Sequence, residues 1–252
     1  MKQFMNKPYS PACDRNGTPI LEALQLHFAD RRHVLEIGAG TGQHAVRFAA
    51  ALPQLTWQTS DREDYLPGIR MWLDEAHLPN TPPPLPLDVK GAWPGRGFDA
   101  LFSANTLHIM AWEEVRILFE RLPHILAADA RVCIYGPFRY AGQPISPSNA
   151  EFDAALRAED PRRGIRDFDA VDGLAREQGF LPFEPVGDMA GRVPWRGDDL
   201  RGELADLHHV TVVHADIAPV IRLPFAPWHF TRLPPPRHPR RRPQPATGEF
   251  RG

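Results

Sequence analysis

The chain has 252 residues, enough for one large domain with an appendage, and its 42% hydrophobic and 24% charged residues are typical of a globular protein. No apolar run approaches the roughly 18 residues that a membrane span needs, which excludes an integral membrane protein. With only two cysteines, the chain cannot form a disulfide scaffold or an all-cysteine metal site. The first residues contain no apolar leader segment, so we expect a cytoplasmic protein in which both thiols are reduced.

The charge is unevenly distributed along the chain. The formal net charge is −2, yet the last 35 residues hold seven arginines, nine prolines and a single acid, so the preceding residues are acidic. We therefore predict a folded domain over residues 1–217 and a basic, Pro/Arg-rich, disordered tail over residues 218–252. The acidic body argues against nucleic acid as a substrate, whereas the tail leaves contact with nucleic acid or another polyanion open. Nothing in the sequence indicates an oligomeric state.

Short apolar runs alternate with longer amphipathic stretches along the first 190 residues. The first helix is predicted to begin at the cap Thr18, with Pro19 at its first position. Further helices are expected at residues 43–51, 64–78, 112–126, 149–158 and 167–178. Strands are expected at residues 33–37, 55–60, 84–87, 98–103 and 131–135, with 180–186 and 209–215 as a sixth and a seventh. The alternation predicts a Rossmann-like α/β fold, with a mostly parallel seven-stranded sheet and helices on both faces.

The strongest motif is VLEIGAGTG at residues 34–42, a strand running into closely spaced glycines before a helix. Glycines at this point let the backbone approach a bound nucleotide. From Gly40 the sequence also satisfies the dinucleotide pattern G-x-G-x-x-G/A. Glu36 favours the other cofactor that uses such loops, S-adenosylmethionine (SAM), because a carboxylate suits a sulfonium and an ammonium but not a pyrophosphate. An NAD-dependent oxidoreductase, which would need a Tyr-x-x-x-Lys pair that the chain lacks, is the weaker alternative.

Two further acids end predicted strands. Asp61 comes 19 residues after Gly42, where it would accept hydrogen bonds from ribose hydroxyls. The pattern E-x-G-x-G-x-G at residues 36–42 resembles the SAM loop of class I methyltransferases, and this resemblance implies that Asp88, at the end of the third strand, accepts from the adenine amino group. A surface carboxylate or a helix cap is the alternative for Asp61 and Asp88. The predicted cofactor-binding residues are Glu36, Gly38, Ala39, Gly40, Gly42, Asp61, Asp88, Val89 and Ser103.

An acceptor would lie above the carboxyl ends of the fourth and fifth strands, beside the cofactor. Methyl transfer depends mainly on positioning, and a base is needed only if the acceptor must lose a proton. The candidate catalytic residues are His108 and Tyr135, for which packing is the alternative. The candidate substrate residues are Asp14, Arg15, Asn16, Asn105, Phe138 and Arg166, the first three in a segment that could form a lid. No metal-ligand spacing stands out, so no metal is expected.

Long motifs over residues 8–186 resemble the domain-of-unknown-function 938 family of methyltransferase-like proteins. The matching segments read SPACDRN at residues 10–16, QHA at 43–45, SAN at 103–105, YGPF at 135–138 and GIRD at 164–167. The resemblance implies a class I SAM-dependent methyltransferase fold and leaves the substrate open. The chain departs from the family pattern at Arg163 and after Met189: either residues 209–215 supply the last strand after an insertion, or the natural end has been replaced.

The sequence therefore predicts a SAM-dependent methyltransferase acting on an unidentified small molecule. The principal alternative is a module that binds SAM or its product S-adenosylhomocysteine (SAH) without turnover.

Overall fold

The computed structural model describes residues 6–141, 144–181, 184–186 and 209–214. In chain order the elements are α1 (Pro11–His27), β1 (His33–Ile37), α2 (Gln43–Ala51), β2 (Thr56–Asp61), the short 3₁₀ helix η1 (Glu63–Tyr65), α3 (Leu66–Ala76), β3 (Leu85–Pro86), β4 (Phe98–Ala104), α4 (Trp112–Ile125), β5 (Leu126–Gly136), β6 (Phe138–Arg139), α5 (Pro147–Glu159), β7 (Arg166–Asp167), α6 (Phe168–Glu177), β8 (Glu184–Val186) and β9 (His209–His214). The predicted tail at residues 218–252 lies outside the described residues.

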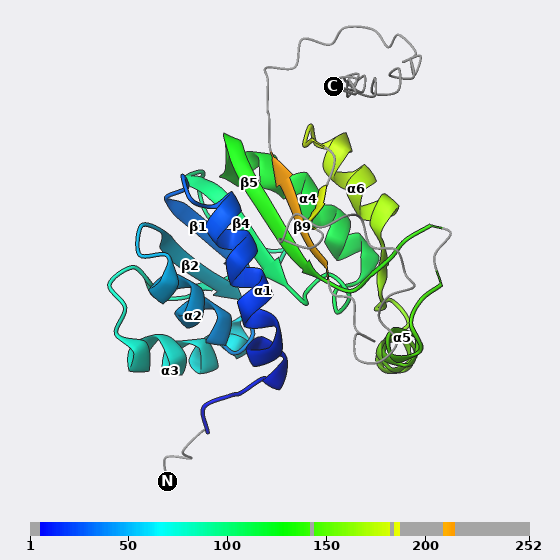
Figure 1. The fold of residues 1–252 in the computed structure, drawn as a ribbon, viewed down its shortest axis with the longest axis horizontal. Helices are drawn as coiled ribbons and strands as arrows, with labels where there is room; N and C mark the ends of the chain where they lie inside the picture. The colour runs from blue at the N-terminus through cyan, green and yellow to red at the C-terminus, as the bar shows by residue number, and fades with distance from the viewer. Residues whose placement is uncertain (1–5, 142–143, 182–183, 187–208, 215–252) are drawn as a thin grey trace, which may run out of the picture. The chain divides into compact units, whose positions relative to one another are not determined.

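One sheet organises the fold, with strand order β3-β2-β1-β4-β5-β9-β8 (Figure 1). The strands β3, β2, β1, β4 and β5 pair in parallel, and β9 pairs antiparallel with both β5 and β8. The mostly parallel Rossmann-like sheet predicted from the sequence is thus confirmed, with five parallel strands from β3 to β5. Residues 209–214 take the place beside β5, with His214 opposite Arg131 and His209 opposite Gly136.

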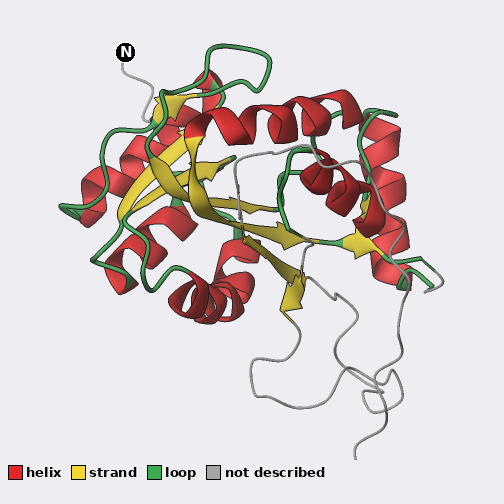
Figure 2. Ribbon diagram, turned by 90° about the horizontal axis from the view of Figure 1, so that it is seen from above, coloured by secondary structure: helices red, strands yellow, loops and turns green. Residues whose placement is uncertain are grey.

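Helices cover both faces of the sheet, as Figures 1 and 2 show. Side chains along a strand alternate between faces, so neighbouring residues of β1 belong to different cores. Val34 packs with α1, α2 and α3 in one cluster, whereas Leu35 packs with α4 and α6 in the other. Burial on both sides explains why the central strands read as almost continuous apolar runs.

The first helix begins earlier than predicted. It starts at Pro11 after the N-cap Ser10, and Pro19 lies inside it. Both prolines fit the first-turn pattern in sequence, but the helix continues through Pro19, with Asn16 and Gly17 buried before it and Ile20 and Leu24 buried after it. As a consequence, residues 14–16 are helical and do not form a loop before the helix.

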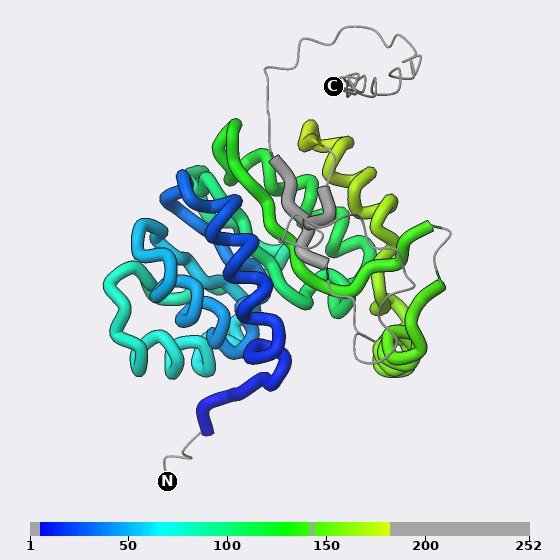
Figure 3. Tube along the Cα trace, viewed as in Figure 1, coloured from blue at the N-terminus to red at the C-terminus, as the bar shows by residue number. Residues whose placement is uncertain are grey.

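The segment before α1 is bound to the fold. The indole N–H of Trp72 donates to the carbonyl of Pro8 at 2.7 Å, and Lys7 forms an ion pair with Glu75 at 2.5 Å. Figure 3 shows the chain passing α3 before it enters α1. Among the helices of the described residues, none has the length and apolar character of a membrane span.

The order of the strands reverses between β1 and β4. From β1 the chain proceeds outward through β2 and β3, then returns to β4 on the other side of β1. The loops that follow β1 and β4 therefore leave neighbouring strands in opposite directions, which is the usual ligand site of an open α/β sheet. Beyond β5 the chain forms a second, two-stranded sheet of β6 and β7. Helix α5 lies on the right of Figure 1, on the opposite side of the molecule from α2 and α3.

Candidate functional site

The loop between β1 and α2 is built around three glycines with left-handed backbone conformations. The φ angles are 74° at Gly38, 58° at Gly40 and 91° at Gly42, values that residues with a side chain rarely adopt. A Cβ on Gly38 would lie 2.5 Å from Oγ1 of Thr106, whereas a Cβ on Gly40 would meet no atom within 4 Å. The loop is thus packed against protein at Gly38 and open at Gly40.

Asp61, at the end of β2, fastens this loop. Its Oδ2 accepts from the N–H of Gly40 at 2.7 Å, and its Oδ1 accepts from the N–H of Arg62 at 2.7 Å. Burial raises the pKa of Asp61, and the two backbone donors oppose that effect. Each carboxylate oxygen can accept more than one hydrogen bond, so Asp61 retains acceptor capacity beside the open part of the loop.

Glu36 lies beneath the loop on the face covered by α1, α2 and α3. It is 2% exposed, and its Oε2 accepts from Nε1 of Trp57 at 2.7 Å. Burial raises the pKa of Glu36 to about 7; the hydrogen bond from Trp57 opposes this rise, and the nearby charge of Asp61 adds to it. The carboxylate is therefore held in place and is only partly ionised near neutral pH.

The remaining predicted cofactor residues differ in their surroundings. Asp88 is exposed and accepts from the N–H of Lys90 at 2.9 Å, while Val89 is buried. Ala39 is 7% exposed, and its N–H donates to the carbonyl of Ser60 at 3.1 Å. Ser103 is buried and donates to the carbonyl of Ile37 at 2.9 Å, so its hydroxyl ties the end of β4 to the end of β1.

The loop after β4 connects the glycine loop to α5. Asn105 has a φ of 55°, and its N–H donates to the carbonyl of Tyr135 at 2.8 Å. Three residues later, the imidazole of His108 packs edge-on against the ring of Phe152 with centroids 5.2 Å apart. A Cβ on Gly136 would lie 3.8 Å from Nδ1 of His108 and 3.9 Å from the Cα of Asn105. Asn105 and His108 therefore both lie beside the backbone of Gly136, at the carboxyl ends of β4 and β5.

Two predicted residues near this point occupy the protein core. Tyr135 is 4% exposed and packs in the cluster formed with α1, α2 and α3, on the other side of the sheet from α4 and α6. Phe138 packs edge-on against Phe168 with ring centroids 5.9 Å apart, in the cluster formed with α4 and α6. Neither position favours direct contact with an acceptor.

The predicted lid segment lies in the first turns of α1. Asp14 accepts from the hydroxyl of Tyr9, Arg15 is exposed, and Asn16 is buried. Just before them, the N–H of Ser10 donates to Oε1 of Gln43 at 2.5 Å, which fastens the start of α1 to the start of α2. Asp14, Arg15 and Asn16 therefore follow the point at which α1 is attached to the start of α2.

Arg166 is held by backbone carbonyls. Its Nε donates to the carbonyl of Leu107 at 3.0 Å, and its other donors bind the carbonyls of Met110 and Arg162. Arg166 is 8% exposed, and the central carbon of its guanidinium lies 5.8 Å from the centroid of the Trp112 ring. Arg166 thus fixes the loop that carries His108, and a direct substrate contact is not favoured.

Sequence reasoning assigned no role to three residues that shape this region. Thr106 packs on Gly38, and Phe152 packs on His108. His44 is 6% exposed, stacks on Phe48 at 5.1 Å, and its Nε2 is a buried atom without a hydrogen-bond partner. Burial lowers the pKa of His44 to about 4. His44 lies in the family segment QHA at residues 43–45, but its burial could not be predicted from the sequence, because histidine is common at protein surfaces.

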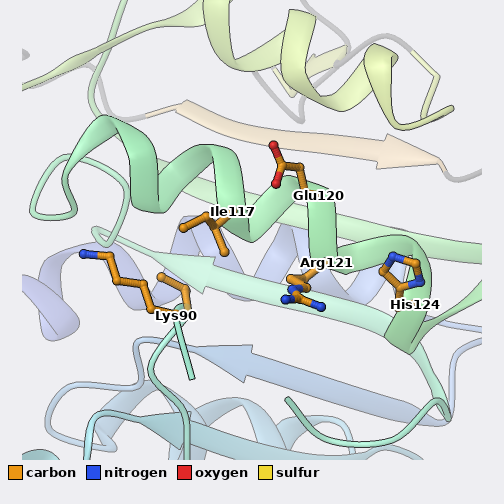
Figure 4. Close-up of a pocket in the computed structure, with 6 residues that line it drawn as sticks. Lys90, Ile117, Glu120, Arg121 and His124 are labelled. Atoms are coloured by element: carbon orange, nitrogen blue, oxygen red, sulfur yellow. The ribbon is translucent and has the colours of Figure 1, made fainter. Parts of the chain in front are cut away.

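A separate pocket of about 380 Å³ lies along α4 (Figure 4). It is lined by Val89, Lys90, Ile117, Glu120, Arg121 and His124. In Figure 4, Ile117, Glu120, Arg121 and His124 belong to α4, whereas Lys90 projects from the segment after β3. Lys90 is paired with Glu114 at 2.6 Å. Val89 is the only predicted cofactor residue among them, so we do not include this pocket in the candidate site.

The strand order and the glycine loop define a class I methyltransferase fold. Residues 7–190 match the family model described as "Protein of unknown function (DUF938)", and the chain belongs to this family.

Solved structures share the fold at low sequence identity. The SAM-dependent methyltransferase SibL is 21% identical, with a TM-score of 0.61 over 81% of this chain and 55% of that chain. An O-methyltransferase family protein from Burkholderia thailandensis is 15% identical, with a TM-score of 0.65 over 83% and 58%. Human N-acetylserotonin methyltransferase in complex with SAM is 14% identical, with a TM-score of 0.60 over 81% and 52%. The chain spans little more than half the length of each of these proteins.

Proposed function

We propose that this protein is a SAM-dependent methyltransferase whose acceptor is a small molecule. The observation that carries the proposal is the glycine loop at the point where the strand order reverses. There the backbone of Gly40 faces open space, and the adjacent carboxylate of Asp61 can accept further hydrogen bonds. The fold shared with SAM-dependent methyltransferases supports the same cofactor.

The residues around the loop fit this cofactor. The open side of Gly40 leaves room for the cofactor to approach the backbone, and Asp61 would accept hydrogen bonds from the ribose hydroxyls. Exposed Asp88 would accept from the adenine amino group, with buried Val89 beside it as an apolar contact. Ala39 and Ser103 would act indirectly, because their own hydrogen bonds hold the ends of β1, β2 and β4 together.

Glu36 would act on the cofactor through its charge. Its carboxylate is buried under the loop and held by Trp57, so it supplies negative potential without touching solvent. A cation bound above the loop favours the ionised form of Glu36, and an ionised Glu36 favours the cation in return. NAD would bring its pyrophosphate to the same place, where ionisation of Glu36 would oppose binding.

When bound, SAM supplies an activated methyl group on a sulfonium, which needs mainly an aligned acceptor. The loop after β4 would provide that alignment, with Asn105 as a hydrogen-bonding group and His108 as the base for an acceptor that must lose a proton. Of the two candidate bases we favour His108. It is as buried as Tyr135, at 5% against 4% exposed, but it lies in the loop after β4 against the exposed ring of Phe152, whereas Tyr135 packs in the core formed with α1, α2 and α3. Asp14, Arg15 and Asn16 would border the acceptor from α1.

Calorimetric titration with SAH, SAM and NAD tests the cofactor assignment. We expect SAH and SAM to bind and NAD not to bind. Gly40→Ala should abolish or strongly weaken SAH binding, because its methyl group fills the open space. Gly179→Ala is the matched control: Gly179 also has a positive φ, 84°, and no atom within 4 Å of a Cβ, but it lies after α6.

Three outcomes distinguish the candidate functions. Binding of NAD alone would favour an oxidoreductase and contradict the proposal. Binding of SAH with no methyl transfer to any of a broad panel of hydroxyl, amine and thiol acceptors would favour a binding module. Equal loss of SAH affinity in Gly40→Ala and Gly179→Ala would show that the loop assignment is wrong.

A further inference from the structure

Two arginines share one buried carboxylate beside the candidate acceptor site. Asp153, on α5, is 6% exposed, and its Oδ2 accepts from Nε of Arg157 at 2.9 Å and from the guanidinium of Arg139. Its Oδ1 accepts from the N–H of Ile165 at 2.6 Å. We call Arg139, Asp153 and Arg157 the Asp153 cluster.

The Asp153 cluster has an excess positive charge. Burial by itself would raise the pKa of Asp153, but the hydrogen bonds from Arg157 and Ile165 outweigh it and lower the pKa below the usual range. One ionised carboxylate therefore faces two guanidinium groups. The side chains of Arg139 and Arg157 remain 43% and 46% exposed, so each can still donate to a ligand.

Nearby acids at the end of α5 are engaged with other arginines. Glu159 pairs with Arg163 at 2.9 Å, and Asp160 pairs with Arg162 at 2.7 Å. The charge of the Asp153 cluster is therefore not neutralised by these two acids.

The cluster is connected to the loop that carries His108. The carbonyl of His108 accepts from the N–H of Gly164 at 3.0 Å. A Cβ on Gly164 would lie 2.6 Å from Nη2 of Arg157 and 2.8 Å from Oδ1 of Asp153, so the guanidinium packs directly on this backbone. Phe152 precedes Asp153, is 40% exposed, and packs on the imidazole of His108. An exposed aromatic ring, an imidazole and a net positive charge thus lie at the carboxyl ends of β4 and β5.

We propose that Arg139 and Arg157 form an anion-binding subsite for the methyl acceptor, and that the acceptor is an apolar ring compound bearing a carboxylate or a phosphate. Phe152 contacts the ring, and the guanidinium groups bind the anion through charge-assisted hydrogen bonds. Asp153 acts as a positioning residue that holds both guanidinium groups in place. The inference rests on the proposed function for the role of the ligand as an acceptor, but the anion-binding site itself does not depend on it.

Titrations of the full chain, with SAH present, test the subsite. The probes are benzoate, phenyl phosphate, inorganic phosphate and the uncharged benzamide. We expect benzoate or phenyl phosphate to bind at least tenfold more tightly than benzamide, and the stronger of the two identifies the anion. Inorganic phosphate should bind more weakly than phenyl phosphate, because it makes no contact with Phe152.

Substitutions locate the effect. Arg157→Gln should weaken binding of the preferred anion about tenfold and leave benzamide and SAH unchanged, while Arg157→Lys should retain part of the affinity. Arg163→Gln, which removes a nearby arginine outside the cluster, is the matched control and should have no effect. If Arg157→Gln folds poorly, the salt dependence of anion binding by the unaltered protein supplies the readout: affinity should fall with ionic strength.

The outcomes separate the subsite from the proposed function. Equal binding of the anions and benzamide by a protein that binds SAH overturns the subsite, as does an equal loss in Arg163→Gln and Arg157→Gln. Preference for the anion in a protein that does not bind SAH supports the subsite and overturns the proposed cofactor.

Discussion

The buried carboxylate of Glu36 predicts a specific dependence of stability on pH. Burial raises its pKa to about 7 in the native protein, from the ordinary value of 4.5 for a glutamic acid. At about 1.4 kcal/mol per pKa unit, the difference corresponds to roughly 3 kcal/mol of native-state stability. The sign follows from linkage: because the native state holds this proton more tightly, the contribution is complete below pH 4.5 and is lost as the pH rises through 7.

Glu36→Gln tests this prediction, since glutamine keeps an oxygen that can accept from Trp57 but does not ionise. The free energy of unfolding, measured by urea denaturation across pH 4.5 to 8, should fall by roughly 3 kcal/mol more in the unaltered protein than in Glu36→Gln. Tryptophan fluorescence is a suitable signal. Glu22→Gln, an exposed substitution on α1, is the matched control.

The comparison isolates Glu36 because other titrating groups are the same in both proteins. Parallel pH profiles for the unaltered protein and Glu36→Gln would refute the assignment of a raised pKa. A similar divergence in Glu22→Gln would show that the effect does not come from burial.

Four further predictions concern the candidate site and the helices around it. Affinity for SAM should increase several-fold from pH 6 to 8, as Glu36 ionises, and titration calorimetry should find no such increase in Glu36→Gln. Gly38→Ala should cost about 2 kcal/mol or more of unfolding free energy, because its φ is 74° and its Cβ would meet Thr106. Gly17→Ala should be nearly neutral in the same urea assay, because its Cβ meets only a flexible arginine side chain and alanine favours the helix. His44 should lose its stabilising contribution as the pH falls from 6.5 to 4, and His44→Leu should remove that loss in acid denaturation profiles.

The elements that the sequence predicts most closely are those with strong local signals. The strand at residues 33–37 and the helix at 43–51 have the predicted bounds, because the glycines between them end one element and begin the next. The start of α1 was predicted wrongly because Pro11 and Pro19 carry the same signal and only tertiary packing selects between them. The two-residue strands β6 and β7 have no periodicity to detect.

The predictions for the candidate site likewise depended on whether a residue's position follows from local sequence or from distant contacts. The glycine loop and Asp61 are brought together as predicted, because both follow neighbouring parallel strands. Residues whose roles depend on distant contacts could not be assigned from the sequence. Arg166 binds the carbonyl of Leu107, 59 residues away, and Phe152 reaches His108 from a helix that follows another strand. Such pairings depend on how α5 returns to the sheet.

The antiparallel strand β9 has a consequence for synthesis of the chain. Residues 209–214 lie beyond the segment that matches the family model, which ends at residue 190, yet they cover the outer edge of β5 from Arg131 to Gly136. As the chain leaves the ribosome, β5 emerges more than 70 residues before the strand that pairs with that edge. During this interval the backbone donors and acceptors of β5 are available to other nascent chains. A stop codon between residues 190 and 209 would make that exposure permanent, leaving the glycine loop intact in a chain prone to aggregate.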